Sequence, residues 1–218
     1  MPRPMNDRWC LVVPVKRLAD AKTRLLGDAR GHRRDLALAF ALDTVSVALA
    51  CPSVEAVVVV TDEADAARLL GAAGAVVVAD EPGAGLNPAL VHGAAAASRA
   101  HPGCGVGALS GDLPALRVDA LAWALARAPA DRACFVPDAD GAGTTALLAR
   151  RPGDFVPAYG VGSAAAHLAS GAVALTDTEL ESLRQDVDTA ADLERALSMG
   201  VGPHTAEVAR RFTTAGCR

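Results

Sequence analysis

The stretch EAVVVVTDEADAARLLGAAGAVVVA, residues 55–79, decides the fold class of this chain. It begins with an apolar run of strand length, Glu55–Thr61, continues with an Ala-rich segment of helical character, and ends in a second apolar run, Ala75–Ala79. Continuous apolar runs are typical of strands that are buried on both faces of a sheet. A strand, a helix and a strand in succession predict two parallel strands joined by a helix.

The same alternation continues on both sides of this unit. We expect further strands at Trp9–Val15, Val106–Ser110 and Ala133–Pro137, and further helices that begin at Arg33, Asn87 and Arg117. The predicted fold is therefore α/β, with a mostly parallel sheet covered by helices on both faces.

The chain after residue 137 has shorter apolar pieces and more turns, which predicts an elaboration with antiparallel or edge strands. We expect a helix that begins at Ser163, a late strand over Leu183–Asp188, and a last helix with Thr189 as its N-cap. No repeat or low-complexity linker occurs, so residues 1–218 are predicted to form a single domain, with loose tails at 1–8 and 201–218.

Composition and charge exclude several classes of protein. With 51% hydrophobic but only 3% aromatic residues, the core must consist mainly of Ala, Val and Leu. A net charge of -4 argues against a nucleic-acid partner and favours a small anionic ligand bound by a local basic cluster. No apolar segment reaches the roughly 18 residues of a membrane span. The five cysteines are far apart in the sequence, as expected for reduced thiols in the cytoplasm.

An acid, Asp112, follows the end of the predicted strand Val106–Ser110. In open parallel sheets, ligands bind beyond the carboxyl ends of the strands. Asp112 stands between Gly111, which allows close approach of backbone, and Pro114, which turns the chain. One interpretation is that Asp112 caps this turn. The other is that Asp112 binds Mg²⁺ with a carboxylate from far along the chain, either Asp188 or Asp186, of which we prefer Asp188.

A basic segment follows the first strand and supplies Lys16, Lys22 and Arg24 where a ligand phosphate would lie. A solvated basic loop is the alternative interpretation. Neither a Walker loop nor a GxGxxG dinucleotide motif is present.

Two glycine-rich segments could contact a ligand or simply start helices. Gly85 and Asn87 suit a nucleobase or ribose edge, although Asn87 could equally be a helix N-cap. Ser163 opens an Ala-rich helix, where free N–H groups could bind an anion, or is an N-cap without a ligand. His167, one helical turn later, is more typical of a packed residue than of a catalytic one.

Taken in order, these segments resemble the 2-phospho-L-lactate/phosphoenolpyruvate guanylyltransferase family of coenzyme F-420 biosynthesis. The resemblance runs from about residue 9 to residue 197 and rests on VPVKRLADAKTRL, VVVVTDE, GLNPAL, SGDLPAL, VPDADGAGTTALL, FVPAYGVGSAAAH and DVDTAADL. The chain departs from the family pattern at Thr145, where Asn is usual, at Ala190, where Pro usually follows Thr189, and at Tyr159, which replaces a common Phe.

The resemblance implies a Rossmann-like α/β/α nucleotidyltransferase domain of the glycosyltransferase-A type that joins GTP to a small phosphorylated three-carbon acid and releases pyrophosphate. It implies that Asp112 and Asp188 together hold two Mg²⁺ ions. It also implies that Thr144, Gly160 and Ser163 bind the acid. The residues on the nucleotide side would be Lys16, Lys22, Arg24, Gly85, Asn87 and Gly111, with the three basic residues taking the catalytic role.

The acceptor is not settled by the motifs. An Ala-, Arg- and Gly-rich, Lys-poor chain suggests an actinobacterial source, for which the resemblance favours phosphoenolpyruvate over 2-phospho-L-lactate. 3-Phosphoglycerate, molybdopterin or a sugar phosphate are alternative acceptors, and a non-catalytic nucleotide-binding protein is a further alternative. A homo-oligomer is compatible with the sequence, and we expect the unstable product to pass to a downstream transferase.

Overall fold

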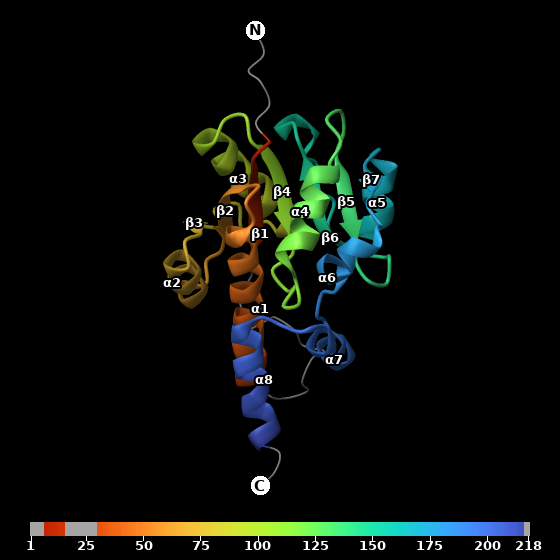
Figure 1. Ribbon diagram of the computed structural model, residues 1–218. Coiled ribbons are helices and arrows are strands. Elements are labelled where there is room, and N and C mark those ends of the chain that lie inside the picture. The colour runs from red at the N-terminus through yellow and green to blue at the C-terminus, as the bar shows by residue number, and fades with distance from the viewer. Residues whose placement is uncertain (1–6, 16–29, 216–218) are drawn as a thin grey trace.

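The computed structural model describes residues 7–15 and 30–215, and its strands form one seven-stranded sheet in the order β3-β2-β1-β4-β6-β5-β7 (Figure 1). The strands are β1 (Trp9–Pro14), β2 (Val54–Val60), β3 (Val76–Val78), β4 (Gly105–Leu109), β5 (Cys134–Pro137), β6 (Thr144–Ala149) and β7 (Val173–Ala174). Strands β1 to β4 are parallel, β6 is antiparallel to β4 and β5, and β7 is parallel to β5. The predicted mostly parallel sheet with an antiparallel elaboration is confirmed.

Helices cover both faces of this sheet. The α-helices are α1 (Arg30–Ala50), α2 (Ala64–Ala72), α3 (Leu86–Ala100), α4 (Val118–Arg127), α5 (Ser163–Ala169), α6 (Glu181–Arg184), α7 (Ala190–Met199) and α8 (Pro203–Ala215), and the 3-10 helices are η2 (Pro152–Asp154) and η3 (Thr178–Leu180). Residues of α1, α2, α4 and α6 share one apolar cluster, and residues of α3 and α5 share another.

The sheet separates these two clusters because side chains alternate along a strand. In β2, Val57 and Val59 belong to the cluster under α1 and α4, whereas Val58 and Val60 belong to the cluster under α3. All four are buried, which explains the unbroken apolar run in the sequence. The three-layer α/β/α arrangement is therefore as predicted.

A third, smaller cluster lies beyond the carboxyl edge of the sheet. Leu36 and Phe40 of α1 pack there against Ala115, Val187 and Ala196, with side chains of α7 and α8 around them. This cluster fixes the C-terminal helices against the lower part of α1 in Figure 1.

The expected late strand over Leu183–Asp188 is wrong. Leu183 belongs to α6, and residues 185–189 run on without a strand partner. Leu183, Gln185 and Val187 are buried while Asp188 is exposed. An extended segment that buries one side has the same alternation as a strand, so the pattern could not distinguish the two.

The expectation of a loose tail after residue 200 is also wrong for Pro203–Ala215, which form α8. The helix lies alongside α1 (Figure 1), and the buried carboxylate of Asp43 on α1 accepts hydrogen bonds from the backbone N–H groups of His204 and Thr205, at 3.1 and 2.8 Å. A distant acid therefore caps this helix, and no local sequence signal could indicate that.

Candidate functional site

The Asp112 turn lies at the carboxyl edge of the sheet, directly after β4. The N–H of Ser110 donates to the carbonyl of Thr145 (2.8 Å), so the turn begins beside the first residues of β6. A Cβ atom on Gly111 would lie 3.3 Å from Val13 Cγ1 and 3.5 Å from the carbonyl oxygen of Pro14. Glycine therefore allows the turn to approach the end of β1 closely.

Long-range hydrogen bonds hold this turn in place. The N–H of Leu113 donates to Thr44 Oγ1 of α1 (3.1 Å), and the N–H of Gly202, which precedes α8, donates to the carbonyl of Pro114 (2.9 Å). Leu113 itself is fully buried, whereas Asp112 is half-buried. The Asp112 backbone is thus anchored from two directions.

The structure brings the second predicted acid to the same turn. The N–H of Val187 donates to the carbonyl of Asp112 (3.1 Å), so the segments that carry Asp112 and Asp188 are in direct contact. Val187 is buried in the third cluster, and Asp186 and Asp188 flank it, the first half-buried and the second exposed. We call the Asp112 turn and residues 186–188 the aspartate side of the site.

Helix α7 starts two residues after Asp188, at Ala190, and fixes the position of the Asp188 backbone. Thr189 is the N-cap, as predicted, and it forms a capping box with Asp192. Burial raises the pKa of Asp192, but the hydrogen bonds that its carboxylate accepts from Thr189 and from the backbone outweigh burial, and the net pKa is lowered. Asp192 also accepts from the N–H of Asp188 (3.1 Å), so a charged carboxylate orients this backbone.

The predicted residues Thr144, Gly160 and Ser163 lie together on a second part of the edge, which we call the hydroxyl side. Thr144 is the first residue of β6 and is 7% exposed; Ser163 is the first residue of α5 and is 2% exposed. The N–H of Ser163 donates to the carbonyl of Gly160, and the N–H of Ala164 donates to the carbonyl of Ala142, both at 3.1 Å. The first bond closes the loop before α5, and the second connects this loop to the glycine-rich loop before Thr144.

The interpretation of Ser163 as a helix N-cap is wrong. Gly162 is the N-cap of α5, with φ at 72°, a left-handed conformation that glycine adopts without strain. Because the N–H groups of Ser163 and Ala164 are used within the chain, the hydroxyl of Ser163 is a better donor for a ligand than the helix end is.

The loop before Thr144 is closed by Asp138, which lies within the segment VPDADGAGTTALL and was not among the predicted site residues. The Asp138 carboxylate accepts from the N–H groups of Ala142 (2.9 Å) and Gly143 (2.7 Å). Arg184 of α6 donates to the carbonyl of Asp138 (2.9 Å) from the other side. An Asp that bonds to backbone a few residues ahead is ordinary turn chemistry, and that was the available signal.

Asn87 is not the N-cap of α3, because that position belongs to Gly85, with φ at 107°. Its amide instead exchanges two hydrogen bonds with the backbone of Tyr159: Asn87 Nδ2 donates to the carbonyl (3.0 Å) and Oδ1 accepts from the N–H (2.8 Å). Asn87 thereby ties α3 to the segment that leads into Gly160.

A small cavity lies between these parts of the edge. It is lined by Pro14 at the end of β1, Leu86 and Leu90 of α3, Ala108, Leu109 and Ser110 of β4 and its turn, and Tyr159. The predicted Lys16, Lys22 and Arg24 follow β1 at this point of the chain, but they lie outside the described residues.

Over residues 7–15 and 30–215, no group of three or more His, Cys, Asp or Glu side chains could hold a metal ion. None of the described helices has the length and apolar character required to cross a membrane. Cys10, Cys51, Cys104 and Cys134 have free thiols, and all four are buried; Cys217 lies outside the described residues.

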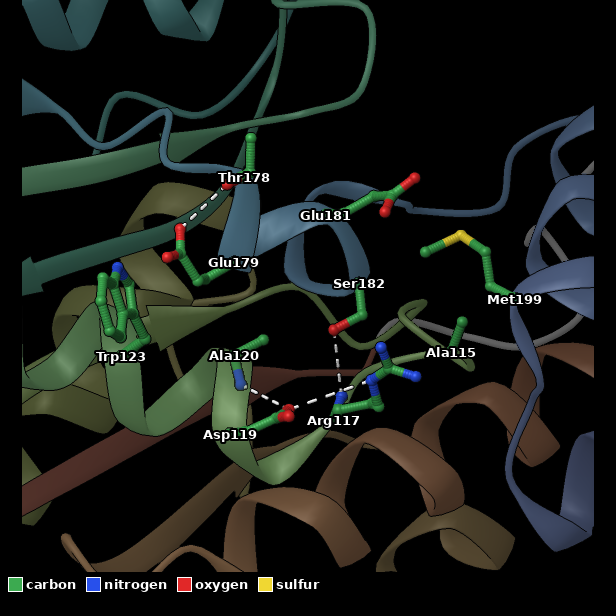
Figure 2. Close-up of a pocket in the computed structure, with 10 residues that line it drawn as sticks. All are labelled: Ala115, Arg117, Asp119, Ala120, Trp123, Thr178, Glu179, Glu181, Ser182 and Met199. Carbon is green, nitrogen blue, oxygen red and sulfur yellow. Dashed lines mark hydrogen bonds and ion pairs between the residues drawn. The ribbon is translucent and has the colours of Figure 1, made fainter.

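A second hollow, shown in Figure 2, lies between α4 and the η3–α6 segment. Ser182 Oγ accepts from the N–H of Arg117 (3.3 Å), and Asp119 Oδ1 accepts from the N–H of Ala120 (2.8 Å). The described residues predicted for the site do not line it, so we assign it no part in the site.

Comparisons with known proteins agree with this geometry. The family model described as "Guanylyl transferase CofC like" matches residues 9–215. A phosphoenolpyruvate guanylyltransferase from Streptomyces coelicolor is 56% identical over 210 residues, which cover 96% of this chain and 99% of the relative. One from Thermomonospora curvata is 56% identical over 205 residues, which cover 94% of this chain and 90% of the relative.

Solved structures share the fold. A nucleotidyl transferase from Methanothermobacter thermautotroptrophicus has a TM-score of 0.59 at 18% identity and covers 86% of this chain and 95% of its own. The structure of Rv0371c from Mycobacterium tuberculosis has a TM-score of 0.55 at 23% identity, covering 88% and 98% of the two chains. The predicted Rossmann-like nucleotidyltransferase fold is confirmed.

Proposed function

The chain belongs to the family of CofC-like guanylyl transferases, and we propose that it transfers GMP from GTP to phosphoenolpyruvate. The products are enolpyruvoyl-diphospho-5'-guanosine and pyrophosphate, which the resemblance assigns to coenzyme F-420 biosynthesis. The observation that carries the proposal is 56% identity with named phosphoenolpyruvate guanylyltransferases over nearly the whole chain.

The reaction needs no general base on the protein. The substrate phosphate is already an anion near neutral pH, so one of its oxygens attacks the α-phosphorus of GTP directly. The new O–P bond forms as the bond from the α-phosphorus to the bridging oxygen breaks, and pyrophosphate leaves with that electron pair. Positioning and charge neutralisation therefore account for the catalysis.

The aspartate side fits a magnesium site. Asp112 and Asp188 come from segments that are hydrogen-bonded to each other, and Asp188 is exposed to an incoming ligand. Magnesium is typically held by one or two carboxylates, with phosphate oxygens and water completing the shell, so a pair of acids suffices. When bound, the metal neutralises charge on the phosphate oxygens during transfer.

The hydroxyl side fits the small acid. Thr144 and Ser163 offer hydroxyl donors, and Gly160, with φ at 141°, leaves its backbone open because it has no side chain. We assign Gly85, Asn87 and Gly111 to the nucleotide, with Asn87 acting through the second hydrogen of an amide that already holds Tyr159. Lys16, Lys22 and Arg24 would neutralise the departing pyrophosphate.

The test is to incubate the purified protein with GTP, Mg²⁺ and one acid at a time, and to measure pyrophosphate release. We expect release with phosphoenolpyruvate. Release with 2-phospho-L-lactate or 3-phosphoglycerate alone would change the assigned acceptor, and no release with any of the three would overturn the proposed function.

A further inference from the structure

His167 is a fully buried polar side chain for which the proposed reaction has no use. Its ring contacts the rings of Phe135 and Tyr159, with centroids 5.5 and 5.4 Å away. A buried polar group requires hydrogen-bond partners, and a ring with two nitrogens can hold two different ones. The identity of these partners determines what the ring does.

One partner fixes the position of the ring proton. The backbone N–H of Ala158 donates to His167 Nε2 (3.0 Å). A peptide N–H can only donate, so Nε2 is the acceptor and carries no hydrogen. Burial lowers the pKa of His167, against an opposing hydrogen bond with the backbone of Ser163, so the ring is neutral and its single proton is on Nδ1.

The other partner is the hydroxyl of Thr144, whose Oγ1 is 2.9 Å from His167 Nδ1. Because Nδ1 carries the proton, Nδ1 donates and Thr144 Oγ1 accepts. The hydroxyl hydrogen of Thr144 is then available to another acceptor. If the ring had the opposite tautomer, Thr144 would have to donate to the ring, and a ligand would meet its lone pairs.

This polarity matters because carboxylate and phosphate oxygens are acceptors only. Thr144 begins β6 at the carboxyl edge, beside the turn that carries Asp112. A hydroxyl that is forced to donate at this point attracts an anionic oxygen, and hydrogen bonds to charged acceptors are the stronger class.

We propose that His167 is a positioning residue that holds the Thr144 hydroxyl as a hydrogen-bond donor to the acid substrate. The same ring binds Ala158, two residues before Gly160, and so aligns both acid-binding segments with one side chain. The proposal rests on the proposed function, since it takes the ligand of Thr144 to be the phosphorylated acid.

The first experiment tests the tautomer on the wild-type protein without any substrate. The ¹⁵N chemical shifts of the His167 ring, assigned by comparison with His167→Gln, are expected to show a protonated Nδ1 and an unprotonated Nε2. A protonated Nε2 would overturn the proposal, whatever reaction the enzyme catalyses.

The second experiment is a double-mutant cycle on steady-state kinetics. Thr144→Val and His167→Gln are each expected to raise the KM for phosphoenolpyruvate by about 10- to 100-fold, the range for a lost hydrogen bond to a charged group, and to leave the KM for GTP unchanged. If His167 acts through Thr144, the double variant is no worse than either single one, because the same contact is lost.

Multiplied effects in the double variant, or equal increases in both KM values, would show a merely structural role and overturn the proposal. His101→Gln is the matched control, because His101 follows α3 at the opposite edge of the sheet, and it is expected to leave both KM values unchanged. A wild-type enzyme that is inactive with every acid would instead contradict the proposed function, while the tautomer measurement would still decide the assignment of His167.

Discussion

The aspartate side and the hydroxyl side of the site are held by different kinds of interaction. Backbone hydrogen bonds and an apolar cluster around Val187 hold the acids of the aspartate side. Buried or half-buried polar side chains that bond to nearby backbone hold the hydroxyl side, namely His167, Asp138 and Asn87. On the aspartate side, polar side chains such as Thr44 and Asp192 hold only the backbone that carries the acids, whereas on the hydroxyl side His167 contacts the hydroxyl of Thr144 itself.

This difference matches what each side has to bind. An ionised carboxylate can only accept, so its role is fixed once its backbone holds it near the metal. A hydroxyl can donate or accept, so it must also be given a direction, and only another polar group can supply one. Substitutions should therefore affect stability and turnover on the aspartate side, and the affinity for the acid on the hydroxyl side.

The largest effect is expected from Asp112→Ala. Loss of a preorganised charged group at the reacting phosphates lowers kcat by at least about 10²-fold. The fold should remain intact, because the Asp112 turn is anchored by its backbone and by Leu113. Pyrophosphate release and thermal unfolding measure the two properties on the same sample.

Asp35→Ala is the control for this variant, since Asp35 is an exposed acid on α1. It is expected to have the wild-type rate and melting temperature. Near-normal turnover of Asp112→Ala at saturating Mg²⁺ would contradict the metal role of Asp112. The aspartate side would then have no assigned function to compare with that of the hydroxyl side.

The next effect is expected from Asp43→Ala, which tests the support that α8 gives to the aspartate side. The buried carboxylate caps α8, and its removal leaves two N–H groups without their acceptor, so the free energy of unfolding should fall by about 2–3 kcal/mol. Urea denaturation measures this loss. The KM for the acid is expected to stay unchanged in the folded protein, and a raised acid KM would show that the two sides are not independent.

The sequence predicts the helices and strands of this molecule better than it predicts the long-range hydrogen bonds that hold the site residues in place. Runs such as Val57–Val60 are unambiguous because every residue in them is buried, and Asp112 was identifiable because it ends such a run. Leu183–Asp188 misled because one-sided burial resembles a strand. The partners of Asn87, Asp43 and His167 lie on other elements, and no local pattern encodes contacts over such sequence separations.

A smaller effect is expected from Ser163→Ala, which tests the hydroxyl side directly. The substitution removes a hydroxyl donor from a nearly buried position but keeps the backbone bonds of the helix start, so the fold is expected to be retained. The KM for phosphoenolpyruvate should rise by about tenfold, with kcat and the KM for GTP close to wild type. An unchanged acid KM would count against the assignment of Ser163.

The smallest effect is a pH dependence that should arise on the hydroxyl side alone. Burial lowers the pKa of His167 below its ordinary value of 6.5, so the unfolded chain binds a proton more readily than the folded chain does. The stability that the neutral ring contributes is complete above about pH 6.5 and declines as the pH falls below it, by at most about 1.4 kcal/mol per pH unit. The apolar and backbone supports of the aspartate side do not titrate in this range, and Asp192, whose pKa is lowered from 3.8, does so only in stronger acid.

His167→Gln cannot take up this proton. Its free energy of unfolding, measured in urea between about pH 7.5 and 5.5, should therefore change less with pH than that of the wild type. An equal change of the free energy of unfolding with pH in the two proteins would mean that the buried ring does not take up a proton on unfolding. The hydroxyl side would then not differ from the aspartate side in its response to pH.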